Sequence, residues 1–341
     1  MNKKIFSILQ YILFLALGIF LVWWSVGKIS EKDWIEIKLA IQSANYVLVI
    51  PVVALLLMSH FSRAVRWRIL MEPLGFRPSL INTYLCVLLG YLANLAIPRL
   101  GEVLKCTFLS RYEKVPADKL VGTIVAERAF DLICLVIVLA ITVFSQLDVI
   151  GHYASATLRS LVLNRSGDFN FIKLALTIGI PLVLLLIIRY FLHRFAHVHI
   201  IQRIKLMLQG ILQGLTSVRF VQHKGLFFFH TALIWIGYLM SIWIGFKAIE
   251  QTSVYGFKTS FSVLTMGSVG MIATQGGIGA YPLLVQETMM LYGLNENIAK
   301  AFGWLLWLVQ FFMVLFFGFL SLILLPVINK NKHEKPGLHP Q

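Results

Sequence analysis

Long apolar runs, separated by short polar and basic connections, make up most of the chain. Six of these runs hold about 20 residues or more with few or no charges. A helix that rises ~1.5 Å per residue crosses a ~30 Å hydrocarbon core over such a length. The runs therefore predict an all-α polytopic membrane protein with six full spans, at residues 5–26, 46–71, 120–146, 171–192, 226–249 and 301–327.

Two further apolar regions, residues 80–113 and 259–293, are interrupted by Gly and Pro. We predict that each is a re-entrant or broken helical hairpin that enters and leaves on the same side. The order span, span, hairpin, span then occurs twice, with opposite orientation. This order predicts an inverted repeat with halves at about residues 1–146 and 170–327, a design that recurs in transporters. Coincidence of spacing is the alternative, because no clear residue-level similarity links the halves.

Composition agrees with a chain that lies within the bilayer. Hydrophobic residues make up 58% and charged residues 13% of the chain, against roughly a quarter charged in soluble domains. We predict one transmembrane domain over residues 1–341, with a basic cytoplasmic tail at 328–341. The formal charge of +15 suits the anionic lipid headgroups of an inner leaflet and needs no nucleic acid.

The distribution of the basic residues sets an orientation. If both hairpins return to the side they enter, most of the 30 Lys and Arg residues face the same side as the N-terminus. Cytoplasmic loops carry such an excess, so we predict a multi-pass protein of the cell (inner) membrane with both termini in the cytoplasm. A complete crossing by residues 80–98 would instead turn the basic clusters after Arg99 and Arg189 outward.

No metal or cofactor chemistry is visible in the sequence. Cys86, Cys106 and Cys134 lie far apart in apolar stretches, and the histidines show no HExxH or similar spacing. We expect the cysteines to be small packed hydrophobes, and we predict no metal site and no cofactor.

Charged residues within an apolar helix are the strongest local signal. Glu127, Arg128 and Asp131 lie some 12 to 18 Å along the helix that begins near Leu120. Spacings of three and four place them on one face, where they can partly neutralise one another. Each costs about 2.5 kcal/mol or more at that depth. They are either a functional site or a structural ion pair that locks two helices together.

A second signal lies at the break in the first hairpin, in Asn94, Pro98, Arg99, Gly101 and Glu102. If the helix resumes after Pro98, its N-terminus and Arg99 together form an anion site suited to a phosphate. A basic turn at the membrane interface is the alternative.

The third signal is glycine-rich and comprises Gly276, Gly277 and Gly279, with Glu287 in the next apolar segment. Three glycines in four residues let the backbone approach a ligand or a neighbouring helix closely. The motif lacks the lysine of a phosphate-binding P-loop, so nucleotide binding is not expected. Close helix packing is the alternative.

Taken together, these motifs resemble the flippase-like membrane half of the lysylphosphatidylglycerol synthases, the multiple peptide resistance factor family. The resemblance covers nearly the whole chain and rests on these residues in this order: Arg63, Arg66, Trp67, Arg68, Asn94, Pro98 to Glu102, Glu127, Arg128, Asp131 and Gly276 to Gly279. It implies a lipid-related role. Many relatives have an acidic residue soon after the glycine motif, whereas the nearest acid here is Glu287.

The sequence leaves three functional hypotheses open. The first is a lipid transporter or flippase that moves an anionic or polyprenyl-type lipid between leaflets, with the residues of the three motifs in binding or gating roles. The second is an intramembrane lipid-modifying transferase, with Glu127 or Asp131 as general base and Arg99 holding a phosphate. The third is a scaffold or assembly factor. Relatives with an aminoacyl-transferase domain carry it after the membrane region, and here a short tail follows, so that activity is not expected.

Overall fold

The computed structural model describes residues 31–97, 99–146 and 221–333, together with residues 16, 19–23 and 27. Within these residues the secondary structure is entirely helical, without a strand. The predicted span at 171–192 and most of the span at 5–26 lie outside the described residues, as does most of the predicted tail.

Four of the predicted spans fall on described helices, which are α3 (Val49–Met71), α6 (Ala117–Ser145), α10 (Lys224–Gly245) and α13 (Glu296–His333). The short helix α2 (Glu31–Gln42) precedes them. Among the described residues, three segments are long and apolar enough to cross a membrane: Tyr46–Leu74, Lys224–Ala248 and Glu296–Lys330. The fold is consistent with a helical membrane protein, while the number of six spans remains a prediction.

The first broken region forms a hairpin of α4 (Leu80–Ala96) and α5 (Leu100–Glu113). The Ser79 backbone N–H donates to the Glu113 carboxylate at 3.1 Å, so the second arm ends beside the start of the first. Glycines allow the two arms to touch, since a Cβ atom on Gly101 would overlap the carbonyl oxygen of Gly90. The hairpin therefore returns to the end from which it starts, as predicted.

The second broken region forms the hairpin of α11 (Phe257–Ala273) and α12 (Ala280–Leu291). The hydroxyls of Ser262 and Tyr292 lie 2.9 Å apart, which again joins the start of one arm to the end of the other. Between the arms, Gly276, Gly277 and Gly279 have φ values of 59°, 73° and 72°. Glycine adopts this left-handed region without the steric penalty of a Cβ atom, so the glycines permit the sharp reversal.

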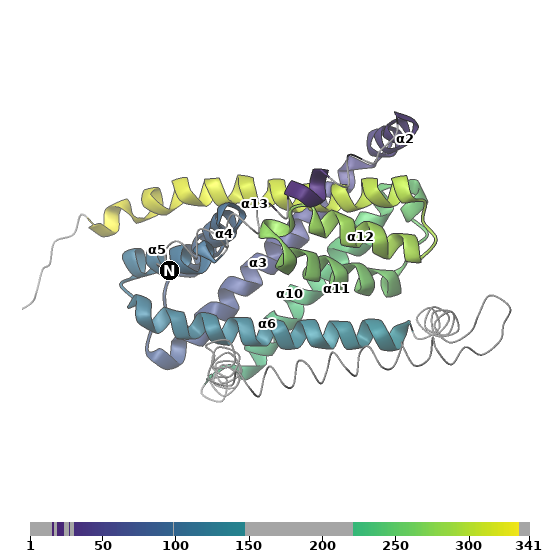
Figure 1. The fold of residues 1–341 in the computed structure, drawn as a ribbon. Coiled ribbons are helices and arrows are strands. Elements are labelled where there is room, and N and C mark those ends of the chain that lie inside the picture. Colours follow the sequence, from purple (N-terminus) through teal and green to yellow (C-terminus); the bar gives the residue numbers. More distant parts are fainter. Residues whose placement is uncertain are drawn as a thin grey trace, which may run out of the picture.

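The two hairpins lie at opposite ends of the molecule, α4 and α5 at the left of Figure 1 and α11 and α12 at the right. Their tips meet: the Gln275 side chain donates through Nε2 to the Leu95 carbonyl oxygen at 2.8 Å. Trp307 of α13 donates to the carbonyl oxygen of Gly276 at 2.9 Å. The inverted repeat stays a prediction, because the fourth predicted span and most of the first lie outside the described residues.

Long helices hold the hairpins in place. Helices α6 and α13 run along opposite long sides of the molecule, and α3 and α10 cross obliquely between them, packed against each other (Figure 1). Around the second hairpin the core includes Phe246 and Phe302, which stack with ring centroids 5.1 Å apart. Around the first it includes Trp67 and Leu109, which are fully buried.

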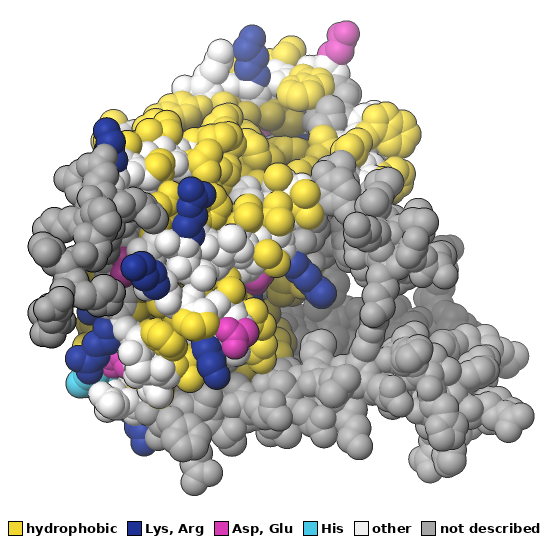
Figure 2. Space-filling view, turned by 90° about the vertical axis from the view of Figure 1, so that its left-hand side faces the viewer, with side chains coloured by type: hydrophobic (Ala, Val, Ile, Leu, Met, Phe, Trp, Pro, Cys, Tyr) yellow, Lys and Arg dark blue, Asp and Glu magenta, His cyan; other side chains and the backbone are white. Residues whose placement is uncertain are grey.

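One end of the molecule is basic. Figure 2 views the end that holds α4 and α5, and Lys and Arg side chains are spread over it. Chain position and exposure identify basic residues of this end: Arg77, Arg111, Lys114, Lys119 and Lys224. The opposite end mixes the exposed acids Glu31, Glu250 and Glu296 with the exposed bases Lys38, Lys247 and Lys258. The orientation in the membrane stays a prediction.

Candidate functional site

A buried network of ion pairs joins α3 to α6. Arg63 and Arg66 lie three residues apart on α3, and Glu127 and Asp131 lie four apart on α6, so each pair shares one helix face. Arg63 Nη1 lies 2.9 Å from Glu127 Oε1 and also contacts Asp131 Oδ2. Arg66 Nη2 lies 2.6 Å from Asp131 Oδ1. The Arg66 side chain is 0% exposed and that of Glu127 is 1% exposed, so these charges depend on one another rather than on water.

Helix α5 adds a third cation to this network. Lys105 Nζ lies 2.8 Å from Glu127 Oε2, so both oxygens of Glu127 accept hydrogen bonds from cations. The same ammonium group lies 4.6 Å from the centroid of the Trp67 ring, a cation–π contact. Trp67 in turn donates through Nε1 to Thr123 Oγ1 at 2.8 Å. Helices α3, α5 and α6 are therefore connected through buried polar contacts.

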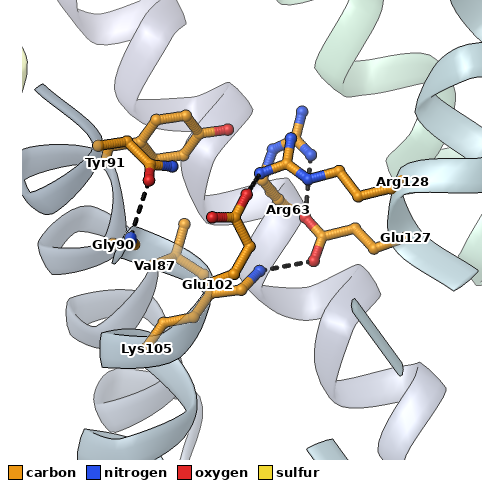
Figure 3. Close-up of a pocket in the computed structure, with 10 residues that line it drawn as sticks. Arg63, Val87, Gly90, Tyr91, Glu102, Lys105, Glu127 and Arg128 are labelled. Carbon is orange, nitrogen blue, oxygen red and sulfur yellow. Dashed lines mark hydrogen bonds and ion pairs between the residues drawn. The ribbon is translucent and has the colours of Figure 1, made fainter. Parts of the chain in front are cut away.

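A more exposed ion pair adjoins the buried ones. Arg128 of α6 pairs with Glu102 of α5, and their side chains are 49% and 23% exposed. Figure 3 shows the guanidinium groups of Arg63 and Arg128 close together, with Glu102 and Glu127 beside them. The Oε2 atom of Glu102 is buried and has no hydrogen-bond partner in the described part of the chain. Arg128 is thus the most accessible cation of the network.

The observed ion pairs differ from those that the sequence predicted. The spacing predicted that Glu127, Arg128 and Asp131 neutralise one another on one face of a helix. The carboxylates of Glu127 and Asp131 are instead bound by cations of α3 and α5, and Arg128 pairs with Glu102. Intrahelical spacing could not show this, because cations on neighbouring helices compete for the same carboxylates. Ion pairs between neighbouring helices, which the sequence analysis gave as the structural alternative to a functional site, are therefore present.

A partly open cavity of about 400 Å³ adjoins the network and is lined by residues of α3, α4, α6, α10, α11, α12 and α13. Its described charged lining residues are Arg63, Arg128 and Asp131. Uncharged polar and aromatic residues line further parts, namely Tyr91, Trp235, Tyr238, Ser241, Ser268, Tyr281 and Gln310. Aliphatic and thioether side chains complete the wall, from Leu56 on α3 to Met271 and Ile272 beside the tip of the second hairpin. The cavity thus offers a charged patch within mostly apolar surroundings.

A smaller space of about 20 Å³ adjoins the same ion pairs. Asn94, Gly101, Glu102 and Lys105 line it together with Arg63 and Arg128. A volume of this size holds about one water molecule. Arg63, Arg128 and Tyr91 line both spaces, so they separate the small polar pocket from the large cavity.

The first hairpin contains the predicted helix break, but the N-terminus of α5 differs from the predicted anion site. The helix resumes at Leu100, and the Asn94 side-chain oxygen accepts a hydrogen bond from the Gly101 N–H at 2.8 Å. The Gly101 N–H, which we predicted to be available to a bound anion, therefore already donates to the Asn94 side chain. Arg99 is exposed and adopts left-handed backbone with φ 66°, while Pro98 lies outside the described residues.

The glycine motif lies at a close contact between the hairpins. A Cβ atom on Gly276 would lie 2.9 Å from Leu95 Cδ2, and one on Gly277 would lie 2.5 Å from Met271 Sδ. Close packing, the alternative reading of this motif, is therefore present. Glu287 is exposed on α12 and is not among the residues that line the two spaces. The structure does not bring Glu287 together with the other candidate residues.

Sequence reasoning missed four residues of this site, which are Arg63, Arg66, Lys105 and Tyr91. The two arginines entered only among the residues that carry the family resemblance, without a role in the site. A signal for them was present, because two carboxylates placed deep in an apolar helix require cations as partners. Arg63 and Arg66 have the spacing needed to supply them from one face of the preceding span.

Comparison with known proteins gives two findings. The family model described as the lysylphosphatidylglycerol synthase TM region matches residues 11–318. A UPF0104 membrane protein from Methanocaldococcus jannaschii is 22% identical over 287 residues, covering 80% of this chain and 82% of the relative. No solved structure matches. The resemblance inferred from the motifs is thereby confirmed.

Proposed function

The chain belongs to the lysylphosphatidylglycerol synthase transmembrane-region family, and on this premise we propose that it is a transporter that moves a lipid with an anionic headgroup between leaflets. The observation that carries the proposal is the cavity of about 400 Å³, which has Arg63, Arg128 and Asp131 on an otherwise mainly apolar wall. A polar headgroup cannot enter hydrocarbon without a large penalty, so a transporter must supply polar partners along its route.

Arg128 is suited to receive a lipid phosphate. A guanidinium group carries five N–H donors in a planar fork that matches two phosphate oxygens. The contact of Arg128 with Glu102 involves Nη2 alone, and the side chain is 49% exposed. The remaining donors are available to a headgroup in the cavity, while Arg63 and Tyr91 form adjacent wall.

The meeting tips of the hairpins suit a gate. Gln275 and Leu95 join the tips of the two hairpins, which come from opposite ends of the bundle, and Met271 and Ile272 line the cavity next to that contact. In transporters built from inverted repeats, discontinuous helices surround the substrate near the bilayer midplane and move relative to one another to change access. We assign the same role to the two hairpins here.

The pairing of the carboxylates favours transport over lipid modification. A general base must accept a proton during the reaction. Within the network Glu127 pairs with three cations and Asp131 with two, so their oxygens are already occupied and their access to a substrate is limited. The ion pairs therefore suit a fixed electrostatic frame around a headgroup better than an acid–base pair.

We further propose that the basic end faces the cytoplasm of the cell membrane, with both termini on that side. Helix α13 ends there, after running the length of the molecule (Figure 1). The exposed Lys and Arg residues of this end would lie at the anionic inner leaflet.

Reconstitution into lipid vesicles tests the proposed transport. The vesicles contain acyl-labelled phosphatidylglycerol, and chemical quenching of the label in the outer leaflet measures its movement. The intact protein should accelerate movement over protein-free vesicles, and Arg128→Ala should lower the rate at least about tenfold, as expected for loss of a charge-assisted contact. Arg77→Ala is the matched control, because that side chain is 63% exposed and lies outside the cavity. Equal rates for the Arg128 variant and the intact protein would remove this residue from the transport route.

A further inference from the structure

The charges of the site do not balance, and the imbalance indicates which lipid class fits. Four cations, Arg63, Arg66, Lys105 and Arg128, are joined by ion pairs to three carboxylates, Glu102, Glu127 and Asp131. The network therefore holds one positive charge in excess. In a low-dielectric interior an uncompensated charge is unfavourable, and a single negative charge beside it restores neutrality.

The described charged residues that line the large cavity also include one more cation than carboxylates. Its described charged residues are two cations, Arg63 and Arg128, and one carboxylate, Asp131. The surplus is reached from the cavity at Arg128, since Arg66 is 0% and Arg63 only 7% exposed, whereas Arg128 is 49% exposed. The wall and the complete network thus agree on a site with one positive charge in excess.

No free anion of the described wall is left to receive a headgroup ammonium. Asp131 is the only described carboxylate of the lining, and its two oxygens already bind Arg66 through Oδ1 and Arg63 through Oδ2. An amino headgroup would place its cation next to two guanidinium groups without a counter-charge. Electrostatic repulsion therefore opposes aminolipids at this site.

The remaining polar lining suits hydroxyl groups. Ser241, Ser268 and Gln310 are uncharged polar residues of the lining. Such groups donate to or accept from alcohols without changing the net charge. The lining can bind a polyol beside the phosphate that Arg128 holds.

We propose that the cavity selects lipids whose headgroup is a phosphodiester with one negative charge and uncharged hydroxyl groups, and that it discriminates against aminoacylated and other amino headgroups. This inference rests on the proposed function and names its substrate class. It separates this chain from the aminoacylated lipid that appears in the name of its family, because that lipid carries ammonium groups that the described wall cannot pair.

The test measures lipid retention and lipid movement separately. The full-length protein is reconstituted in vesicles containing equal amounts of phosphatidylglycerol, phosphatidylethanolamine and lysylphosphatidylglycerol. Native mass spectrometry then reports which lipid stays bound, and acyl-labelled forms report movement. We expect phosphatidylglycerol to be retained about tenfold or more over phosphatidylethanolamine, with lysylphosphatidylglycerol retained least.

Two variants change the charge excess in opposite directions. Arg128→Gln removes the excess and should abolish the preference for phosphatidylglycerol over phosphatidylethanolamine. Glu102→Gln raises the excess to two. In vesicles that also contain an equal amount of phosphatidate, which can carry two negative charges, this variant should shift retention toward phosphatidate. Arg77→Gln and Glu250→Gln change exposed residues outside the cavity and serve as controls.

The outcomes distinguish the inference from the proposed function. Equal retention of the three lipids, or preferential retention of lysylphosphatidylglycerol, overturns the charge selection even where lipids are moved. Selective retention of phosphatidylglycerol without acceleration of any lipid supports the selection and overturns transport. Should the Glu102 variant fail to fold, retention by the intact protein and by Arg128→Gln still decides the inference.

Discussion

Gln275, in the tip of the second hairpin, donates its side-chain amide to the carbonyl oxygen of Leu95 in the tip of the first, at 2.8 Å. The same amide also reaches the carbonyl of Ala96. Both carbonyls belong to the last turn of α4, where a helix has no backbone donors left for them. One side chain thus satisfies the end of a broken helix and joins two segments that lie 180 residues apart in sequence.

Gln275→Leu should weaken this contact and destabilise the fold. Leucine is similar in size but leaves two partly buried carbonyl oxygens without this donor, at a cost of about 1 kcal/mol, the net contribution of a typical hydrogen bond. Thermal unfolding in detergent should show a lowered midpoint, whereas Gln251→Leu, at an exposed position, should change it little. An unchanged midpoint for the Gln275 variant would mean that the tips do not depend on this amide.

Gly101→Ala should separate the arms of the first hairpin. The added methyl group would overlap the carbonyl oxygen of Gly90, which is backbone and cannot rotate away. The control is Gly122→Ala in α6, where nothing lies within 4 Å of the added atom, so that change should stabilise the helix by up to about 1 kcal/mol. Thermal unfolding compares the two variants. Similar midpoints would contradict the close contact of α4 and α5.

The buried pair of Lys105 and Glu127 should show strong coupling. Lys105→Met or Glu127→Gln alone leaves a buried charge with fewer partners, at a cost of about 3–5 kcal/mol. The double variant should cost less than the sum by about 0.5–3 kcal/mol, measured as the free energy of unfolding in a denaturing detergent titration. The control pair is Lys300 with Glu296, which are one helical turn and 3.6 Å apart. Their side chains are 6% and 58% exposed, and because Glu296 is solvated their coupling should be about 0.5 kcal/mol or less. Equal coupling energies in the two pairs would mean that burial does not strengthen the interaction of Lys105 with Glu127.

Ser268→Phe should block the cavity without disturbing its charges. Ser268 lines the cavity from α11 and bonds only to the carbonyl of Leu264 in its own helix. A phenyl ring there would occupy space that a headgroup needs, so labelled-lipid movement should fall at least about tenfold. Ser43→Phe is the control, because Ser43 is exposed and lies beyond the end of α2. Undiminished movement by the Ser268 variant would exclude the cavity as the route.

Local sequence patterns predicted where helices begin and end better than they predicted which residues of different helices contact one another. The breaks after Ala96 and Ala273 were visible because Pro and Gly interrupt apolar runs, and both hairpins form where expected. The contact between Gln275 and Leu95 was not visible, since a single glutamine in a glycine-rich turn gives no indication of a distant carbonyl. Such pairings follow from tertiary packing, which the spacing within one helix does not determine.

The candidate site shows the same limit. Glu127, Arg128 and Asp131 were found because charges deep in an apolar helix are costly. Their partners were not assigned, because Arg63 lies 64 residues from Glu127 and near the basic end of its own span. The packing of α3 against α6 brings Arg63 inward to the carboxylates, and no property of α3 alone predicts that direction.

An electron cryomicroscopy map of the full-length protein in phosphatidylglycerol nanodiscs tests the central claim most directly. The account predicts a lipid in the cavity, with its phosphate within about 4 Å of the Arg128 guanidinium group, a distance at which a charge-assisted contact forms. A map with an empty cavity, and with lipid phosphates only on the outer surface of the helix bundle, would contradict it.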